Sequence, residues 1–339
     1  MNKISMSARV KILFVVFSLL TLALFIADLM FGSVKVSPAE IAAVLTGGGD
    51  GSVNERIIID IRLVKAIVAV IAGAALSVSG LQMQTLFQNP LAGPSVLGVT
   101  SGASLGAALL IIGLPVAGGM SPVLSSFGVA GAAWLGAAAV MAVIVAVSRR
   151  IKDIMVILIL GMMFSSGVSA IVQVLQYVSN ESALKSFVIW TMGALGDVTY
   201  TQLALLAPVF LAGMVLAVAA VKPLNLLLLG EKYARTMGLN VKRSRTMVFL
   251  STTLLAGSVT AFCGPIGFIG LAVPHVARYV FSSSDHRILV PATTLVGAAA
   301  MLVCDLISKT MNFPVNTITS LLGIPIVVWV VVRNKNIFR

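Results

Sequence analysis

Charged residues are scarce in this 339-residue chain, because Asp, Glu, Lys and Arg together make up only 10% of it. A soluble domain carries about 25% charged residues. With 59% hydrophobic residues and a mean hydropathy of +1.08, the chain lacks the polar surface of an ordinary water-soluble protein. The composition is typical of a protein that crosses a membrane many times.

Residues that catalysis or ion coupling would need are also missing. The sequence has no G-x-x-x-x-G-K-[ST] phosphate loop, so it cannot hydrolyse ATP by that route. No Asp, Glu, Lys or Arg is expected in the middle of a span, which argues against a proton- or ion-coupled carrier. His275 and His286 belong to no cluster of carboxylates or cysteines, and Cys263 and Cys304 read as small packing residues. We predict no catalytic residue, no metal site and no cofactor.

Apolar runs long enough to cross a bilayer recur along nearly the whole chain. A spanning helix needs about 20 apolar residues. We therefore predict an all-α, polytopic integral membrane protein with ten transmembrane helices, forming one transmembrane domain over residues 1–339. The predicted spans are residues 12–31, 64–82, 96–112, 123–147, 154–178, 202–221, 246–262, 269–281, 288–307 and 317–332.

The net charge of +12 does not indicate a nucleic-acid partner, because the basic residues divide unevenly between the two sides of the membrane. With the N-terminus inside, 17 of the 23 Lys and Arg residues fall on cytoplasmic segments and the other six on outer segments. The positive-inside rule then favours ten spans with both termini cytoplasmic. Asp28 and Asp305 are expected near span ends, where their carboxylates can reach headgroups or water.

The stretch 62–106 contains an apolar helix with a polar, broken end. Gln82, Gln84 and Gln88 follow the apolar run, and a Pro/Gly break at 89–94 comes before the next span. Irregular backbone within a membrane is tolerated only where protein or a water-filled cavity covers it. We therefore expect this end to line a route through the membrane.

Small residues recur at helical spacing on several predicted spans, where they usually let helices approach closely. For Gly102 and Gly106, and for the set Gly128, Ala132 and Gly136, we expect packing. The set Gly73, Ser77 and Gly80 continues toward the glutamines, so packing and pathway lining both stay open for it.

A second break interrupts the C-terminal half at Gly264-Pro265-Ile266-Gly267. Paired interruptions in the two halves of a membrane protein indicate a translocation pathway, although a tight turn between packed helices is the alternative. The predicted pathway residues are Gly80, Gln84, Gln88, Asn89, Pro90, Gly98, Gly264, Pro265 and Gly267.

The longest basic cytoplasmic stretch, 222–245, predicts a short helix between Gly230 and Gly238, where Glu231 and Arg235 can pair four residues apart. A helix of two turns is not stable alone, so it needs something to pack against. A plain basic anchor beside the lipid headgroups is the alternative.

The order of these motifs resembles the FecCD-type permease subunits of bacterial ABC importers for iron-siderophore, haem or cobalamin. The matching strings are Arg62, Gly73-Ala74-Ala75-Leu76, Ser79-Gly80, Gln84, Asn89-Pro90-Leu91-Ala92, Leu97-Gly98, Leu229-Gly230-Glu231, Ala234, Gly238, Gly264-Pro265-Ile266-Gly267-Phe268 and Pro274-His275 with Arg278. Two departures are Val64 and Lys65, where the family has Pro and Arg. The loop between Asp305 and Thr319 is also shorter than usual and carries Asn312 and Asn316 in place of Glu and Gly.

The resemblance implies a multi-pass permease of the cell inner membrane that works as a homodimer, surrounded by membrane lipid. It implies two further kinds of partner: two ATPase subunits on the cytoplasmic side, and a periplasmic or lipid-anchored substrate-binding protein on the other side. The residues it assigns to ATPase coupling are Leu229, Gly230, Glu231, Ala234, Arg235 and Gly238. It assigns docking of the binding protein to Arg62, Lys65 and Lys309.

The cargo that the resemblance favours is an iron chelate, either a ferric siderophore or haem, with cobalamin as the alternative. An ATP-independent secondary carrier and a non-transporting membrane scaffold are less favoured. The missing midplane charges argue against the first, and the paired Gly/Pro breaks argue against the second.

Overall fold

The computed structural model describes residues 8–32, 36–48, 51–113, 122–151 and 153–333, and within these ranges it contains helices and no strand. The two chain ends, 1–7 and 334–339, lie outside the described residues, so their predicted cytoplasmic location is not addressed.

The helices follow one another with short connections. Their bounds are α1 Ala8–Met30, α2 Pro38–Leu45, α3 Val53–Arg56, η1 Ile57–Leu63, α4 Val64–Leu86, η2 Pro94–Leu97, α5 Val99–Ala108, η3 Leu109–Gly113, α6 Pro122–Ser148, α7 Ile154–Val178, α8 Glu181–Thr191, α9 Tyr200–Ala219, α10 Val221–Leu227, α11 Glu231–Thr236, α12 Val241–Thr252, η4 Thr253–Gly257, α13 Ser258–Cys263, α14 Ile269–Phe281, α15 His286–Met311 and α16 Val315–Arg333.

Each of the ten predicted apolar runs is mostly helical in the structure, although the run 96–112 is interrupted at the left-handed Gly98. Within the described residues, six helical stretches are long and apolar enough to cross a membrane: α1, the part of α6 from Phe127, α7, α9, the continuous stretch Val241–Cys263, and α15. Shorter apolar helices cover Val99–Gly113, Ile269–Phe281 and Val315–Val330. The all-α membrane class is therefore confirmed, while the number of ten crossings stays a prediction.

Helix α4 forms the centre of the fold, packed against α14 and α15 through glycines. A Cβ on Gly80 would come within 1.7 Å of the Gly270 carbonyl oxygen in α14, and one on Gly73 within 2.2 Å of the Gly297 carbonyl oxygen in α15. Only glycine permits such backbone approach between helices. This contact gives Gly80 a packing role, which was one of the two alternatives for its stretch.

Helices α5 and α6 pack in the same way, as expected from their small residues. A Cβ on Gly106 would lie 2.0 Å from the Ala132 carbonyl oxygen, and one on Gly102 would lie 2.5 Å from that of Gly136. The small side chains on both helices therefore let the two backbones contact each other directly, without the large side chains that separate helices in the core of a soluble protein.

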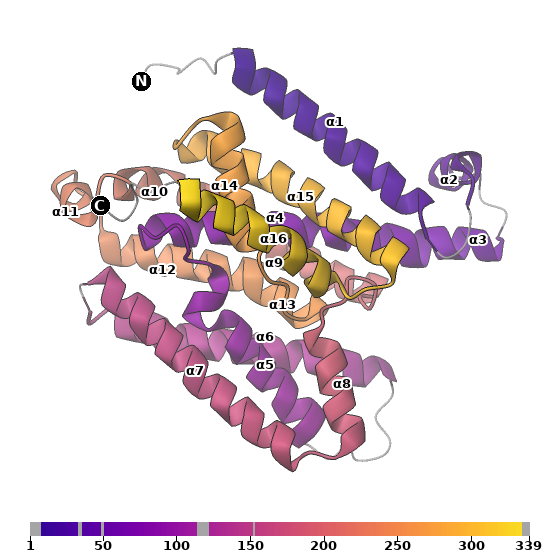
Figure 1. Cartoon of the computed structure of the whole chain (residues 1–339), viewed down its shortest axis with the longest axis horizontal. Coiled ribbons are helices and arrows are strands. Elements are labelled where there is room, and N and C mark those ends of the chain that lie inside the picture. Colours follow the sequence, from indigo (N-terminus) through magenta and orange to yellow (C-terminus); the bar gives the residue numbers. More distant parts are fainter. Residues whose placement is uncertain (1–7, 33–35, 49–50, 114–121, 152, 334–339) are drawn as a thin grey trace.

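Two helices bury little of their surface within the single chain. Helix α1 lies along one edge of the molecule beside α15, and α7 lies along the opposite edge (Figure 1). Exposed aliphatic side chains cover much of both helices, including Leu19, Leu22, Met163 and Val174. Such faces suit lipid or a second protein chain.

The two ends of the helix bundle carry different short elements. Helices α10 and α11 lie at one end, and α2 and α3 lie at the opposite end (Figure 1). The predicted topology makes the α10–α11 end cytoplasmic, because the basic loop 222–245 belongs to it.

Candidate functional site

The segment 229–238 forms the short helix that its sequence predicts. Helix α11 lies between Gly230, with φ 95°, and Gly238, with φ 80°, and both backbones are in the left-handed region that glycine adopts most readily. The amide of Leu239 donates to the carbonyl oxygen of Ala234 at 3.0 Å, which closes the helix just after Gly238.

A buried arginine holds α11 in place. The guanidinium of Arg245, from α12, donates through both Nε and Nη2 to Oε1 of Glu231, with the Nε bond at 2.9 Å. Its Nη1 donates to the Ile151 carbonyl oxygen at 3.2 Å, so it also connects α11 to the loop between α6 and α7. The predicted pair of Glu231 with Arg235 is present but longer, at 3.5 Å. The sequence pattern did not single out Arg245.

Ala234 is fully buried against the chain itself, so the expectation that it presses on an external partner is not supported by its position. The small residue is needed because α11 packs here on its own chain. The exposed large apolar side chains of the segment are instead Leu229, Tyr233 and Met237, at 63%, 49% and 58%. Tyr233 lies on α11, whereas Leu229 comes just before the helix and Met237 just after its last residue.

The polar end of α4 meets the C-terminal half of the chain at α14. Gln84 Nε2 donates to the Leu271 carbonyl oxygen at 3.1 Å, and Arg278 donates through Nη1 to Gln84 Oε1. His275 Nε2 lies 2.8 Å from the Pro90 carbonyl oxygen and 3.3 Å from Gln84 Nε2. The first break and the Pro-His-x-x-Arg motif, far apart in sequence, therefore form one polar cluster.

Gln88 connects this cluster to α10, the helix that precedes the segment 229–238. Its backbone has φ 48°, a left-handed conformation that is unusual for a residue with a side chain. Its Nε2 donates to the Leu227 carbonyl oxygen, at the end of α10, at 2.8 Å. A cavity of 440 Å³ opens between Gln84, Gln88, Pro90, Leu229 and Arg278.

A second set of polar contacts joins α4, α10 and α15 close by. The hydroxyl of Thr85 lies 2.8 Å from His286 Nε2, and His286 Nδ1 lies 2.7 Å from Asn225 Oδ1. Asn225 Nδ2 in turn donates to Asp285 Oδ1 at 2.6 Å. Helix α10, which leads into α11, is thus fixed to the transmembrane helices by hydrogen bonds.

The second break lies just before the first turn of α14. Gly264 has φ 72° and packs beside the end of α8, where a Cβ would meet the Trp190 carbonyl oxygen at 2.4 Å. The amide of Gly267 donates to Asn316 Oδ1 at 2.9 Å. The unusual Asn316 therefore supports the break directly. Gly98, with φ 80°, packs separately against α6 and α7.

Gln82, the third glutamine of this stretch, has an internal role. It is fully buried, donates to Ser251 Oγ at 3.1 Å and accepts from Thr252 Oγ1 at 3.4 Å. Its amide therefore joins α4 to α12.

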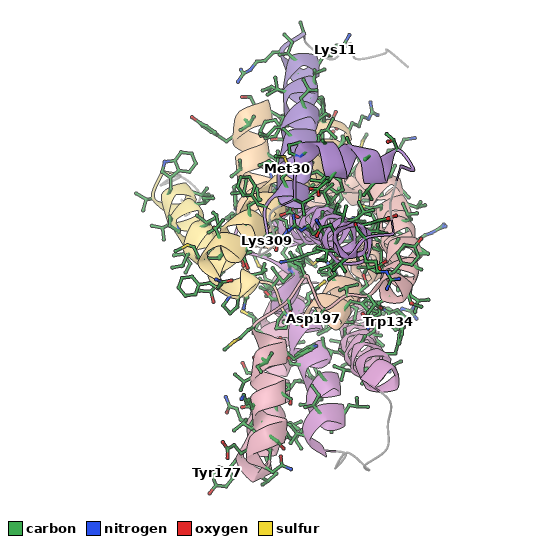
Figure 2. All side chains as sticks on the ribbon, turned by 90° about the vertical axis from the view of Figure 1, so that its right-hand side faces the viewer. Lys11, Met30, Trp134, Tyr177, Asp197 and Lys309 are labelled. Carbon is green, nitrogen blue, oxygen red and sulfur yellow. The ribbon has the colours of Figure 1, made fainter. Side chains whose placement is uncertain are left out.

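Arg62, Lys65 and Lys309 come together at the outer end around two carboxylates. Lys65 Nζ lies 3.0 Å from Asp305 Oδ1, and Lys309 Nζ lies 2.7 Å from Asp28 Oδ2 and 3.0 Å from Asp305 Oδ2. Figure 2 labels Lys309 near Met30, the last residue of α1. The expectation that the two aspartates reach water or headgroups is wrong, because both are fully buried and paired with lysine.

Arg62 has a different internal task. Its Nη1 donates to the carbonyl oxygens of Leu29 and Met30 at 2.8 and 3.0 Å, where α1 ends with unpaired carbonyls. Its side chain is buried, and a hollow of 730 Å³ beside it is lined also by Lys65 and Lys309. The predicted docking cations thus share one surface hollow, but each already has partners in its own chain.

Comparisons with known proteins agree with these motifs. The model of the FecCD transport family matches residues 20–333. The chain is 36% identical over 282 residues to the hemin transport system permease protein HmuU of Yersinia pestis, covering 82% of this chain and 83% of that protein. It is 34% identical over 280 residues to the vitamin B12 import system permease protein BtuC of Klebsiella pneumoniae subsp. pneumoniae, covering 81% and 82%.

A solved structure is similar over almost the full length. It is described as an inward-facing conformation of a metal-chelate type ABC transporter, with a TM-score of 0.80, 30% sequence identity, and coverage of 93% of this chain and 96% of that one.

Proposed function

The chain belongs to the FecCD transport family and is a multi-pass permease subunit of an ABC importer, and we propose that two copies of it enclose one translocation pathway. We also propose that each copy crosses the membrane ten times and has both termini in the cytoplasm. The membrane is the cell inner membrane.

The exposed face of α7 supports a second copy. Ser166, Ala170, Gln173 and Tyr177 are all exposed and follow one another at intervals of three and four residues, so they share one face of a predicted span. Figure 2 places Tyr177 at the far tip of this helix. Polar side chains are unfavourable against lipid but suit a hydrated path between two protein chains.

The ATPase partner is best supported by α11. The Glu231–Arg245 pair holds the helix on the rest of the chain, and at the cytoplasmic end α11 exposes Tyr233, with the exposed Leu229 just before the helix and the exposed Met237 just after it. This exposed apolar surface is the single observation that carries the proposal. It does not belong to a membrane-spanning helix, so contact with lipid does not account for it. Lys232 and Arg235 form an exposed basic rim beside it.

The same contacts suggest how ATP-driven movement would reach the pathway. Drawing two copies of α11 together would pull on α10, and the bond from Leu227 to Gln88 would carry the displacement to the break at 89–94. We therefore propose Gln84, Gln88, Asn89 and Pro90 as the inner end of the pathway.

The remaining predicted pathway residues, Gly98, Gly264, Pro265 and Gly267, are proposed as helix-break positions that shape the route farther out. Gly80 is omitted from the lining, because its Cα faces the backbone of α14.

Docking of a substrate-binding protein at Arg62, Lys65 and Lys309 also stays a proposal. Three cations face two carboxylates in this cluster, which leaves one positive charge in excess at the outer surface. That excess would attract carboxylates of a binding protein mainly by raising the association rate.

The cargo we propose is an iron chelate, a ferric siderophore or haem, in keeping with the hemin permease among the relatives. Cobalamin is the second candidate, in keeping with the vitamin B12 permease. Uptake of each compound into proteoliposomes, with the cognate ATPase and binding protein, would decide between them. Uptake that proceeds without the ATPase would overturn the importer mechanism in favour of a secondary carrier.

The ATPase contact has its own test in Tyr233→Asp, with Tyr200→Asp as the matched control at an exposed tyrosine on the opposite, outer side. An interface tyrosine typically contributes about 2 kcal/mol or more, so we expect at least about 30-fold weaker ATPase binding for the first variant only. Equal ATPase co-purification for both variants would refute the proposed contact.

A further inference from the structure

A groove of 630 Å³ lies where α9, α10 and α15 meet at the cytoplasmic end. Its walls are mostly apolar, with Met214 and Val218 from α9 and Val290, Pro291 and Leu295 from α15. Val218 and Pro291 are exposed, so the groove opens on the outer surface of the helix bundle. In a membrane this surface faces lipid.

Two basic residues lie at one end of the groove. Lys222, just inside α10, and Arg287, in the first turn of α15, both line it and are both exposed. Within the described parts of the chain, the ion pairs formed include neither of these side chains. The nearby Asp285 carboxylate is already engaged by Asn225 Nδ2 and by the Arg287 backbone amide.

His286 also lines the groove but offers no hydrogen bond to a ligand. Both of its ring nitrogens contact protein groups, Nδ1 the Asn225 Oδ1 and Nε2 the Thr85 hydroxyl. The groove therefore offers a ligand two cations, Lys222 and Arg287, at the level of the lipid headgroups. Beyond them the groove is apolar.

We propose that this groove binds one anionic phospholipid of the cytoplasmic leaflet. The phosphate would lie against Lys222 and Arg287, and one acyl chain would lie along Val218, Pro291 and Leu295. Basic pockets between transmembrane helices on the cytoplasmic side suit anionic headgroups, and a zwitterionic lipid carries no net negative charge to offset the two cations. A bound lipid would also hold α10 against α15. Helix α10 leads directly into α11.

The test is native mass spectrometry of the detergent-purified permease, titrated with phosphatidylglycerol and with phosphatidylcholine of the same chains. We expect preferential retention of phosphatidylglycerol. Each cation near a membrane surface contributes about fivefold, so Lys222→Gln with Arg287→Gln should weaken phosphatidylglycerol binding about 25-fold. The control Lys11→Gln with Arg150→Gln removes the same charge from exposed cytoplasmic positions outside the groove and should leave binding unchanged.

A second variant tests the apolar channel without changing charge. Val218→Trp should fill the groove and lower the binding of phosphatidylglycerol. If this variant binds normally while the charge variant does not, the ligand is a headgroup alone and the proposal is overturned. Equal binding of the two lipids by the unmodified permease, or equal loss in the charge variant and its control, would overturn it as well. Thermal unfolding of each variant shows whether it is folded, and a fully folded Val218→Trp keeps the test decisive if the charge variant unfolds.

Discussion

The ion pair between Glu231 and Arg245 should decide whether α11 keeps its position, and its two halves should contribute unequally. The Arg245 side chain is 2% exposed, whereas that of Glu231 is 22% exposed. Removing the glutamate takes away the carboxylate that accepts two hydrogen bonds from a buried guanidinium, while removing the arginine leaves a carboxylate that water and Arg235 can still reach.

The exposed fractions of the Arg245 and Glu231 side chains determine how much free energy each substitution should cost. Glu231→Ala should destabilise the seating of α11 by about 3–5 kcal/mol, the usual cost of breaking a buried ion pair by removing one partner. Arg245→Met should cost only about 1–2 kcal/mol, because the remaining carboxylate regains water. The double variant should resemble Arg245→Met rather than the sum of both. The control Arg235→Met breaks an exposed pair and should cost about 0.5 kcal/mol.

Amide hydrogen exchange of α11 in the purified permease measures this local opening directly. A loss of 3 kcal/mol corresponds to exchange about 150-fold faster in α11, with the core helices unchanged. ATPase binding should fall in the same order, Glu231→Ala first and Arg235→Met last. The reasoning is refuted if Arg245→Met and Arg235→Met exchange alike, or if Glu231→Ala is no worse than Arg245→Met.

Three further predictions concern the core, the outer cluster and the pathway. Gly80→Ala should cost about 3 kcal/mol because its Cβ collides with the backbone of α14, whereas Gly131→Ala, with no neighbour within 4 Å, should leave the melting temperature unchanged. Asp305→Asn should cost about 3–5 kcal/mol by the same measurement, since the buried carboxylate is lost from its pairs with Lys65 and Lys309 and only the Asp28–Lys309 pair remains. A cysteine at the exposed Gln88 should react with a water-soluble thiol reagent faster than one at the buried Gln84, and the opposite order would remove Gln88 from the pathway.

The breaks and the short helix were predictable because their causes are local. Glycine supplies the positive φ at 230, 238 and 264, and Pro90 and Pro265 fall in the two breaks, where no helix continues. Gln88 also has a positive φ, but nothing in its residue type indicates it. Its side chain bonds to Leu227, which lies 139 residues away in the sequence, so no local pattern points to this contact.

The partners of charged residues were not predictable in the same way. Lys242, Arg243 and Arg245 occupy one basic run, and only the packing of α12 determines that the third turns inward. Ala234 shows the same ambiguity, because a small residue suits both a partner surface and a contact within the chain. Ala234 is buried within its own chain, and the exposed residues next to it are Tyr233 and Met237.

The outer cluster joins parts of the chain that no local pattern connects. Asp28 ends a helix that packs along α15, so Lys309 can reach it across 281 residues of sequence. Because both carboxylates are fully buried, their charges require the lysines whether or not a binding protein is present. A docking carboxylate would therefore have to share Lys65 and Lys309 with Asp28 and Asp305, and any movement of those lysines would loosen α1 from α15. Docking at this hollow is thus physically coupled to the position of α1. Docking at isolated surface charges would have no such coupling.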